Sequence, residues 1–82
     1  MSPKEKEKKA KEQFLKSFGA HIKQVRIEKG LSGADLAGML LMDQPNLTRI
    51  EKGRVNVSIY FVKQVCNALE ISFERMFKDF EY

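Results

Sequence analysis

Apolar residues recur with helical spacing along almost the whole chain, and no segment shows the period-two alternation of a half-buried strand. The first helix is predicted from four apolar residues at positions i, i+4, i+8 and i+11, namely Phe14, Phe18, Ile22 and Val25. This helix can begin as early as Ser2, because Pro3 suits a first helical position. We expect it to end before Gly30.

The N-terminal segment differs from the rest of this helix, because KEKEKKAKE has no apolar face to pack against a core. We therefore expect the segment to be frayed. This divides the chain into a charged N-terminal extension (1–13), one domain (14–77) and a short C-terminal tail (78–82).

Two short helices follow in the middle of the chain. Ser32 and Asp35 have the spacing of a capping box and open a helix whose predicted buried residues are Leu36, Ala37 and Leu40. The next helix ends at Gly53, and its buried pair is Leu47 and Ile50. Its N-cap is Asp43 or Gln44, because Pro45 disfavours helical backbone in the residue before it.

Two more helices complete the pattern. Ser58 caps a helix whose predicted inward residues are Ile59, Val62, Val65, Cys66 and Leu69. Ser72 opens a last short helix with Phe73, Met76 and Phe77 facing inward. Five short helices with brief connections predict a compact all-α domain.

The composition and charge of the chain indicate which class of partner it suits. The 82 residues carry a formal net charge of +4, concentrated before residue 70, which suits a polyanionic partner. No apolar run approaches the ~20 residues of a membrane span, and the charged N-terminus does not resemble a secretory signal. We expect a cytoplasmic protein without membrane association.

The sequence contains no recognisable set of residues for catalysis or for a zinc site. One cysteine and one histidine cannot form a zinc site within the chain, and no nucleophile–base pair is recognisable. His21 lies off the apolar stripe and is expected at the surface, whereas Cys66 is expected to fill the core. We expect neither enzymatic activity, nor a metal, cofactor or small-molecule ligand.

The third helix has a distinctive polar face. Gln44, Thr48 and Lys52 form one row along it, and Pro45 and Arg49 lie beside that row. Glutamine can pair with adenine and arginine with guanine, each pairing discriminating by about 1–3 kcal/mol. A solvated polar face is the alternative for this helix taken alone.

Residues 18–77 resemble the Cro/phage-repressor class of helix-turn-helix domains, the XRE family. The matching segments are FGAHIKQVRIEKGLS, DLA, LTRIEKGRVNVS, ALEIS and FERMF. The resemblance implies a five-helix domain of the lambda-repressor type that binds double-stranded DNA. Its third helix would enter the major groove while the second crosses the backbone.

The resemblance also implies roles for individual residues. Base-edge contacts fall on Gln44, Pro45, Thr48 and Arg49. Phosphate contacts fall on Asn46, Lys52, Arg54 and the backbone N–H groups around Val55 and Asn56. A structural ion pair would join Arg26 to Glu51.

Two positions depart from the family pattern. Leu41 stands in the turn where the family usually has glycine, so the turn is either left-handed at a cost of about 1–2 kcal/mol or rearranged. Gly33 stands where the family often has a phosphate-binding glutamine, so that contact is lost.

Aromatic residues are concentrated in the C-terminal half, and exposed apolar patches usually mark an interface. We expect a homodimer interface formed by Tyr60, Phe61, Phe73, Phe77, Phe80 and Tyr82. The alternative is that the N-terminal helix covers Tyr60 and Phe61 through Phe14 and Leu15.

These features favour a transcriptional regulator, with repression at an inverted-repeat operator as its simplest mechanism. The alternative is an antitoxin-like or other protein-interaction module that uses the aromatic C-terminal surface. The N-terminal lysines either follow DNA phosphates or belong to a solvated arm.

Overall fold

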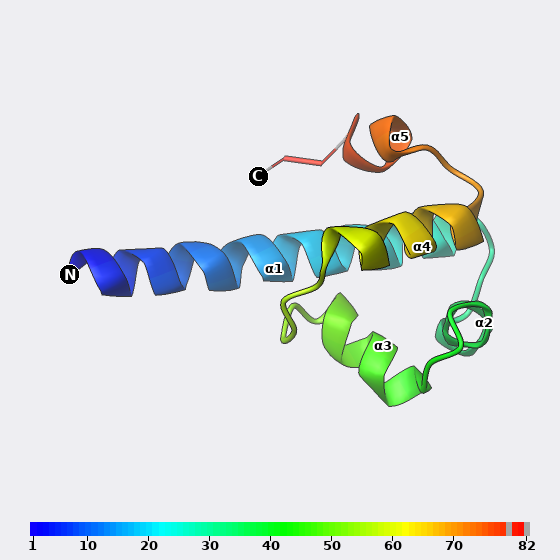
Figure 1. The fold of residues 1–82 in the computed structure, drawn as a ribbon, viewed down its shortest axis with the longest axis horizontal. Helices are drawn as coiled ribbons and strands as arrows, with labels where there is room; N and C mark the ends of the chain where they lie inside the picture. Colours follow the sequence, from blue (N-terminus) through cyan, green and yellow to red (C-terminus); the bar gives the residue numbers. More distant parts are fainter. Residues whose placement is uncertain (79, 82) are drawn as a thin grey trace.

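The computed structural model describes residues 1–78, 80 and 81, and its regular elements in those residues are all α-helices. In chain order they are α1 (Pro3–Glu28), α2 (Gly33–Met39), α3 (Gln44–Glu51), α4 (Ile59–Leu69) and α5 (Phe73–Lys78). Helix α1 runs through the molecule, with α2 and α3 on one side of it and α5 on the other (Figure 1). The predicted five-helix, all-α architecture is confirmed.

Helix α1 is continuous from Pro3, so the expectation of a frayed N-terminus is wrong. The Ser2 hydroxyl caps it by accepting a hydrogen bond from the Glu5 backbone N–H, with Pro3 in the first turn. Glu5 and Glu7 each precede a lysine by four residues, a spacing that favours helix. Its 26 residues span about 39 Å, which accounts for the 41 Å length of the molecule.

The core draws on every helix. Its largest fully buried side chains are Ile22, Leu36, Leu47, Leu69, Met76 and Val65. These were predicted, but Leu40 is only partly buried and Ile59 is 72% exposed, so placing Ile59 in the inward stripe was wrong. Phe61 packs against the core instead, because it lies one turn before Val65 on the buried side of α4.

Two glycines allow the backbone of α1 to approach α3 and the loop after it. A Cβ atom on Gly19 would overlap the carbonyl oxygen of Ile50. A Cβ atom on Gly53 would overlap the backbone of Lys16, and Gly53 also has a φ of +75°. Helix α3 is therefore held directly against α1.

Aromatic rings fill the space between α1 and the C-terminal residues. Phe80 is only 8% exposed and packs against Phe14 and Phe18. His21 was expected at the surface, but it is half-buried and makes a hydrogen bond to the carbonyl oxygen of Met76.

The predicted dimer surface is therefore smaller than expected. Phe80 belongs to the chain's own core, and Phe73 and Phe77 are partly buried against it. Tyr60 is 65% exposed, whereas Tyr82 lies outside the described residues. No described helix is both long and apolar enough to cross a membrane.

Candidate nucleic-acid interface

The turn between α2 and α3 is left-handed at Leu41, which has a φ of +55° and a side chain 94% exposed. The Leu41 N–H donates to the Gly38 carbonyl, and the Met42 N–H donates to the Ala37 carbonyl. Of the two predicted possibilities, the strained turn is the one observed. The chain thus keeps a short turn without the usual glycine, at a cost of about 1–2 kcal/mol.

Helix α3 begins directly after this turn, with Asp43 as its N-cap. The Asp43 side chain makes no capping hydrogen bond, and Pro45 occupies the first turn. Of the two predicted N-caps, Asp43 is therefore correct.

The polar face of α3 is exposed along its length. Gln44, Pro45 and Arg49 are exposed, and Thr48 is half-buried beside them. Leu47 and Ile50 are buried on the opposite face and anchor the helix to the core. The four residues expected to contact bases therefore share one face of α3, on which three are exposed and Thr48 is partly covered.

Two contacts arrange the polar side chains of α3. The Arg49 guanidinium lies 3.4 Å from the amide oxygen of Asn46. The Gln44 side chain passes over Gly33, where an added Cβ atom would lie 3.3 Å from Gln44 Nε2. Gly33, which stands in place of a phosphate-binding glutamine, thus leaves room for the Gln44 side chain.

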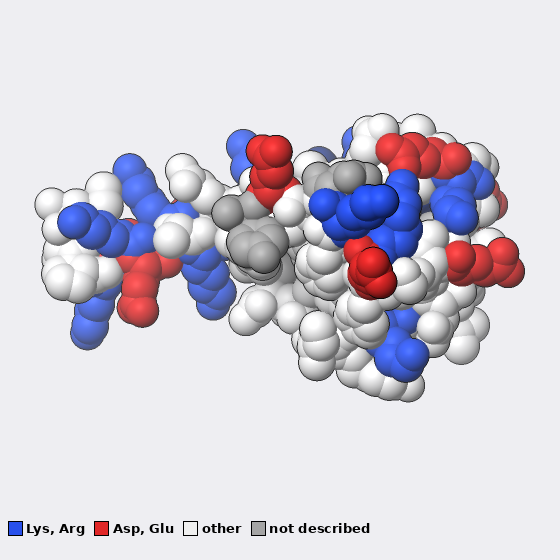
Figure 2. Space-filling view, turned by 90° about the horizontal axis from the view of Figure 1, so that it is seen from above, with Lys and Arg blue, Asp and Glu red and all other residues white. Residues whose placement is uncertain are grey.

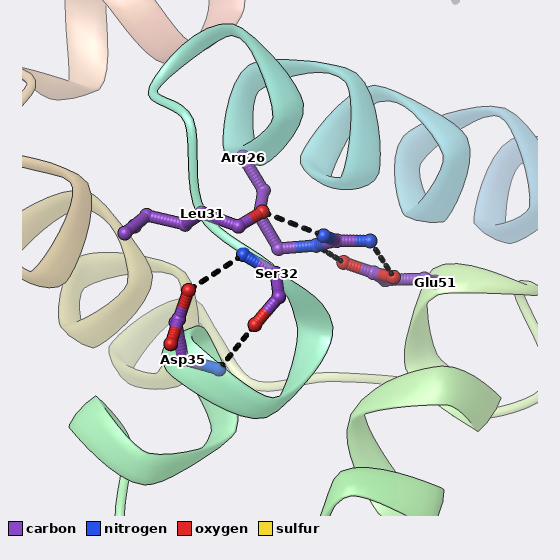
Figure 3. A network of polar contacts seen from close by, with 5 residues as sticks. All are labelled: Arg26, Leu31, Ser32, Asp35 and Glu51. Carbon is purple, nitrogen blue, oxygen red and sulfur yellow. Dashed lines mark hydrogen bonds and ion pairs between the residues drawn. The ribbon is translucent and has the colours of Figure 1, made fainter.

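A buried ion pair fastens α3 to α1 (Figure 3). Arg26 Nε lies 2.8 Å from Glu51 Oε2, and Arg26 Nη2 lies 3.1 Å from Glu51 Oε1. Arg26 Nη1 also donates to the Leu31 carbonyl oxygen at 2.8 Å. The hydrogen bonds that Arg26 donates to the Glu51 carboxylate raise the pKa of Arg26, although burial opposes this shift. This geometry agrees with the expected ion pair, which joins α3 to α1.

A capping box lies beside the ion pair (Figure 3). The Asp35 backbone N–H donates to the Ser32 hydroxyl, and the Ser32 N–H donates to the Asp35 carboxylate. The backbone N–H of Ser32, followed by its hydroxyl, lowers the pKa of the Asp35 carboxyl. The predicted start of α2 is therefore confirmed.

The residues expected to contact phosphates surround the outward face. Asn46, Lys52, Arg54 and Asn56 are exposed, and Val55 is half-buried. Lys52 and Arg54 line a hollow together with Thr48 and with two lysines of α1, Lys16 and Lys23. Lys16 and Lys23 were not predicted from the sequence to belong to this surface, although their seven-residue spacing places them on one side of α1.

Cys66 has no part in this surface. It is 3% exposed within the core, and burial raises the pKa of its thiol despite the nearby charge of Lys63. An un-ionised, enclosed thiol is a poor nucleophile, which agrees with the predicted packing role.

Comparison with known proteins places this geometry in a family. A family model described as helix-turn-helix matches residues 22–76. Among solved structures, the chain is similar to the crystal structure of the clp gene regulator ClgR from C. glutamicum, with a TM-score of 0.70 and 30% sequence identity. That similarity covers 74% of this chain and 78% of the ClgR chain. No curated protein sequence matches the chain. The chain therefore belongs to the XRE family of helix-turn-helix transcriptional regulators.

Proposed function

We propose that the protein is a cytoplasmic transcriptional regulator that binds a specific DNA sequence by inserting α3 into the major groove. The observation that carries this proposal is the largely exposed polar face of α3, a helix joined to α1 by the Arg26–Glu51 ion pair. Gln44 can both donate to and accept from base edges, and Arg49 can donate to them, while Pro45 and Thr48 suit contact with a thymine methyl group. The similarity to a clp gene regulator supports a role in gene control.

Phosphate contacts from Asn46, Lys52, Arg54 and the N–H groups of Val55 and Asn56 would orient α3 in the groove. Such contacts supply affinity that depends on salt but not on sequence. The positive net charge of the chain favours this association.

Repression is the simplest mode of action, because a protein bound over a promoter blocks polymerase. We propose that two copies bind an inverted repeat, with recognition helices about 34 Å apart, one turn of DNA. Tyr60 and Ile59, two of the exposed apolar side chains, lie at the start of α4 and would form this contact. Sedimentation that shows only a 9.5 kDa species at micromolar concentration would exclude the dimer.

A protein-interaction role is the second candidate, favoured by an apolar surface away from α3 that shares Tyr60 with the proposed dimer contact. Met39, Leu41 and Tyr60 are all exposed and line one shallow hollow between α2 and α4. An antitoxin-like module would bind its partner there and would not need the polar face of α3.

Selection of bound duplexes from a random pool, followed by gel shifts, separates the two candidates. Sequence-specific binding predicts an enriched motif, and Arg49→Ala should lower the preference for that motif by about 1–3 kcal/mol, or roughly 5- to 150-fold. Gln44→Ala should relax the preference at a different base. Lys63→Ala, a change on the exposed side of α4, serves as the control. Failure to enrich a motif, or indifference to both α3 substitutions, would favour the interaction module.

A further inference from the structure

Helix α1 extends well beyond the part of the chain that defines the family. The family match begins at residue 22, whereas α1 begins at Pro3, so about five helical turns precede the match. The first turns project from the body as an arm that carries lysines on several sides (Figure 2). Residues 1–14 are exposed. Core packing therefore does not explain why this arm is present.

The arm passes beside the loop that is expected to bind phosphates. Lys8 and Lys11 line one hollow together with Arg54 and Asn56 of the α3–α4 loop. Because Gly53 has no side chain, the loop lies directly against the backbone of α1. The lysines of the arm are thus neighbours of the loop cations, although they lie far from them in sequence.

A second hollow continues the basic surface on the other side of the same loop. Lys16 and Lys23 of α1 line it together with Lys52 and Arg54. The carboxylate in this hollow is that of Glu51, which is already paired with Arg26. Arg54 lines both hollows, so the two groups of cations meet at this residue, and together they are called the basic strip.

We propose that the N-terminal arm of α1, together with the adjoining Lys16, is an additional DNA-backbone-binding element, in which Lys8, Lys11 and Lys16 bind phosphates outside the half-site contacted by α3. This inference rests on the proposed DNA-binding function. From Lys16 to Lys8 the helix advances about 12 Å, a length similar to about three to four base pairs.

The composition of the arm favours a nucleic acid over other partners. Between Lys4 and Gln13 its single apolar residue is Ala10, so it has no apolar face for a lipid surface or a protein groove. Glu12 also lines the first hollow, where three cations, Lys8, Lys11 and Arg54, outnumber it. A strip of this kind suits phosphates and carries no means of distinguishing bases.

Salt dependence of binding tests the arm with a matched pair of double variants. K8Q/K11Q removes two charges beside the loop. K6Q/K78Q removes the same charge elsewhere, because Lys6 lies roughly 160° around α1 from Lys8 and α5 lies across α1 from α3 (Figure 1). Both would be measured on the duplex selected from the random pool and on a scrambled duplex of equal length.

If the arm binds phosphates, K8Q/K11Q should make the negative slope of log K against log salt less steep by about 1–2. K6Q/K78Q should leave the slope unchanged. The ratio of affinities for selected and scrambled duplexes should stay the same in both. A hydroxyl-radical footprint of K8Q/K11Q should lose protection at its outer edge only.

Equal slopes for wild type and K8Q/K11Q, or equal reductions in both double variants, would overturn the proposal. If sequence preference persists in that case, the proposed function stands without the arm. If the wild-type protein shows no preference between the two duplexes, the proposed function fails as well.

Discussion

Leu41 shows how one residue departs from the family pattern without changing the fold. Its backbone adopts the left-handed conformation that glycine adopts freely, and its side chain makes little contact because it is 94% exposed. The strain is tolerated because neighbouring hydrogen bonds to the Gly38 and Ala37 carbonyls hold the turn. A similar left-handed residue, Glu70, ends α4.

Leu41→Gly should therefore stabilise the protein by about 0.5–1 kcal/mol, since relief of strain exceeds the entropy that glycine adds to the unfolded chain. Urea denaturation measures the change. Leu41→Ala keeps a Cβ atom in the strained conformation and serves as the control, with no gain expected. A lower stability of the glycine variant would show that the turn is not strained.

At the scale of elements, the junction of α1 and α3 determines where the recognition surface lies. Gly19 brings the two backbones together, and the Arg26–Glu51 pair ties them through two hydrogen bonds. Both residues of the pair are buried, so either charge left alone would be costly.

Glu51→Ala should destabilise the protein by about 3 kcal/mol, because it leaves the Arg26 guanidinium buried with the Leu31 carbonyl as its remaining partner. Glu28→Gln is the matched control, since it removes the exposed 3.4 Å pair with Arg75 and should cost less than about 1 kcal/mol. Thermal or urea unfolding compares them. Equal losses for both variants would contradict a structural role for the buried pair.

The stability that the Asp35 cap at the start of α2 contributes should depend on pH. The pKa of Asp35 is lowered in the folded state, so its stabilising contribution is present above its ordinary value of 3.8 and is lost as pH falls through the lower, folded pKa. Asp35→Asn should thus reduce stability near neutral pH, and its difference from wild type should shrink as the pH is lowered below 3.8. A difference that stays constant over this range would refute the contribution of the charged cap.

Periodicity and capping residues predicted the five helices and the outward face of α3, because both signals are local. These signals did not predict which side chains are buried where burial depends on contacts between elements. Ile59 and Phe61 lie in the first turn of α4, where either could face inward until the position of the core is known. Phe80 follows the last helix, and its burial depends on packing against Phe18.

The basic strip could not be predicted for the same reason. Lys16 and Lys23 join Lys52 because of how α1 crosses α3, and that crossing depends on Gly19, which looks unfavourable inside a predicted helix. The N-terminal turns of α1 have no apolar stripe, so the start of this helix depends on the Ser2 cap and on the spacing of its charges.

At the scale of the whole molecule, the fold separates two surfaces on opposite sides of α1 (Figure 1). One side presents α3 and the loop after it, with the cations of α1 alongside. The other side holds α5 and the aromatic cluster around Phe18 and Phe80. DNA binding on the first side leaves the second side unobstructed.

The most direct test of the account is a map of backbone amide chemical shifts during titration with the selected duplex. DNA binding through α3 predicts the largest changes over residues 44–56, with smaller changes along the arm and little effect on α5. Changes concentrated on α4 and α5, with the amides of α3 unaffected, would contradict it.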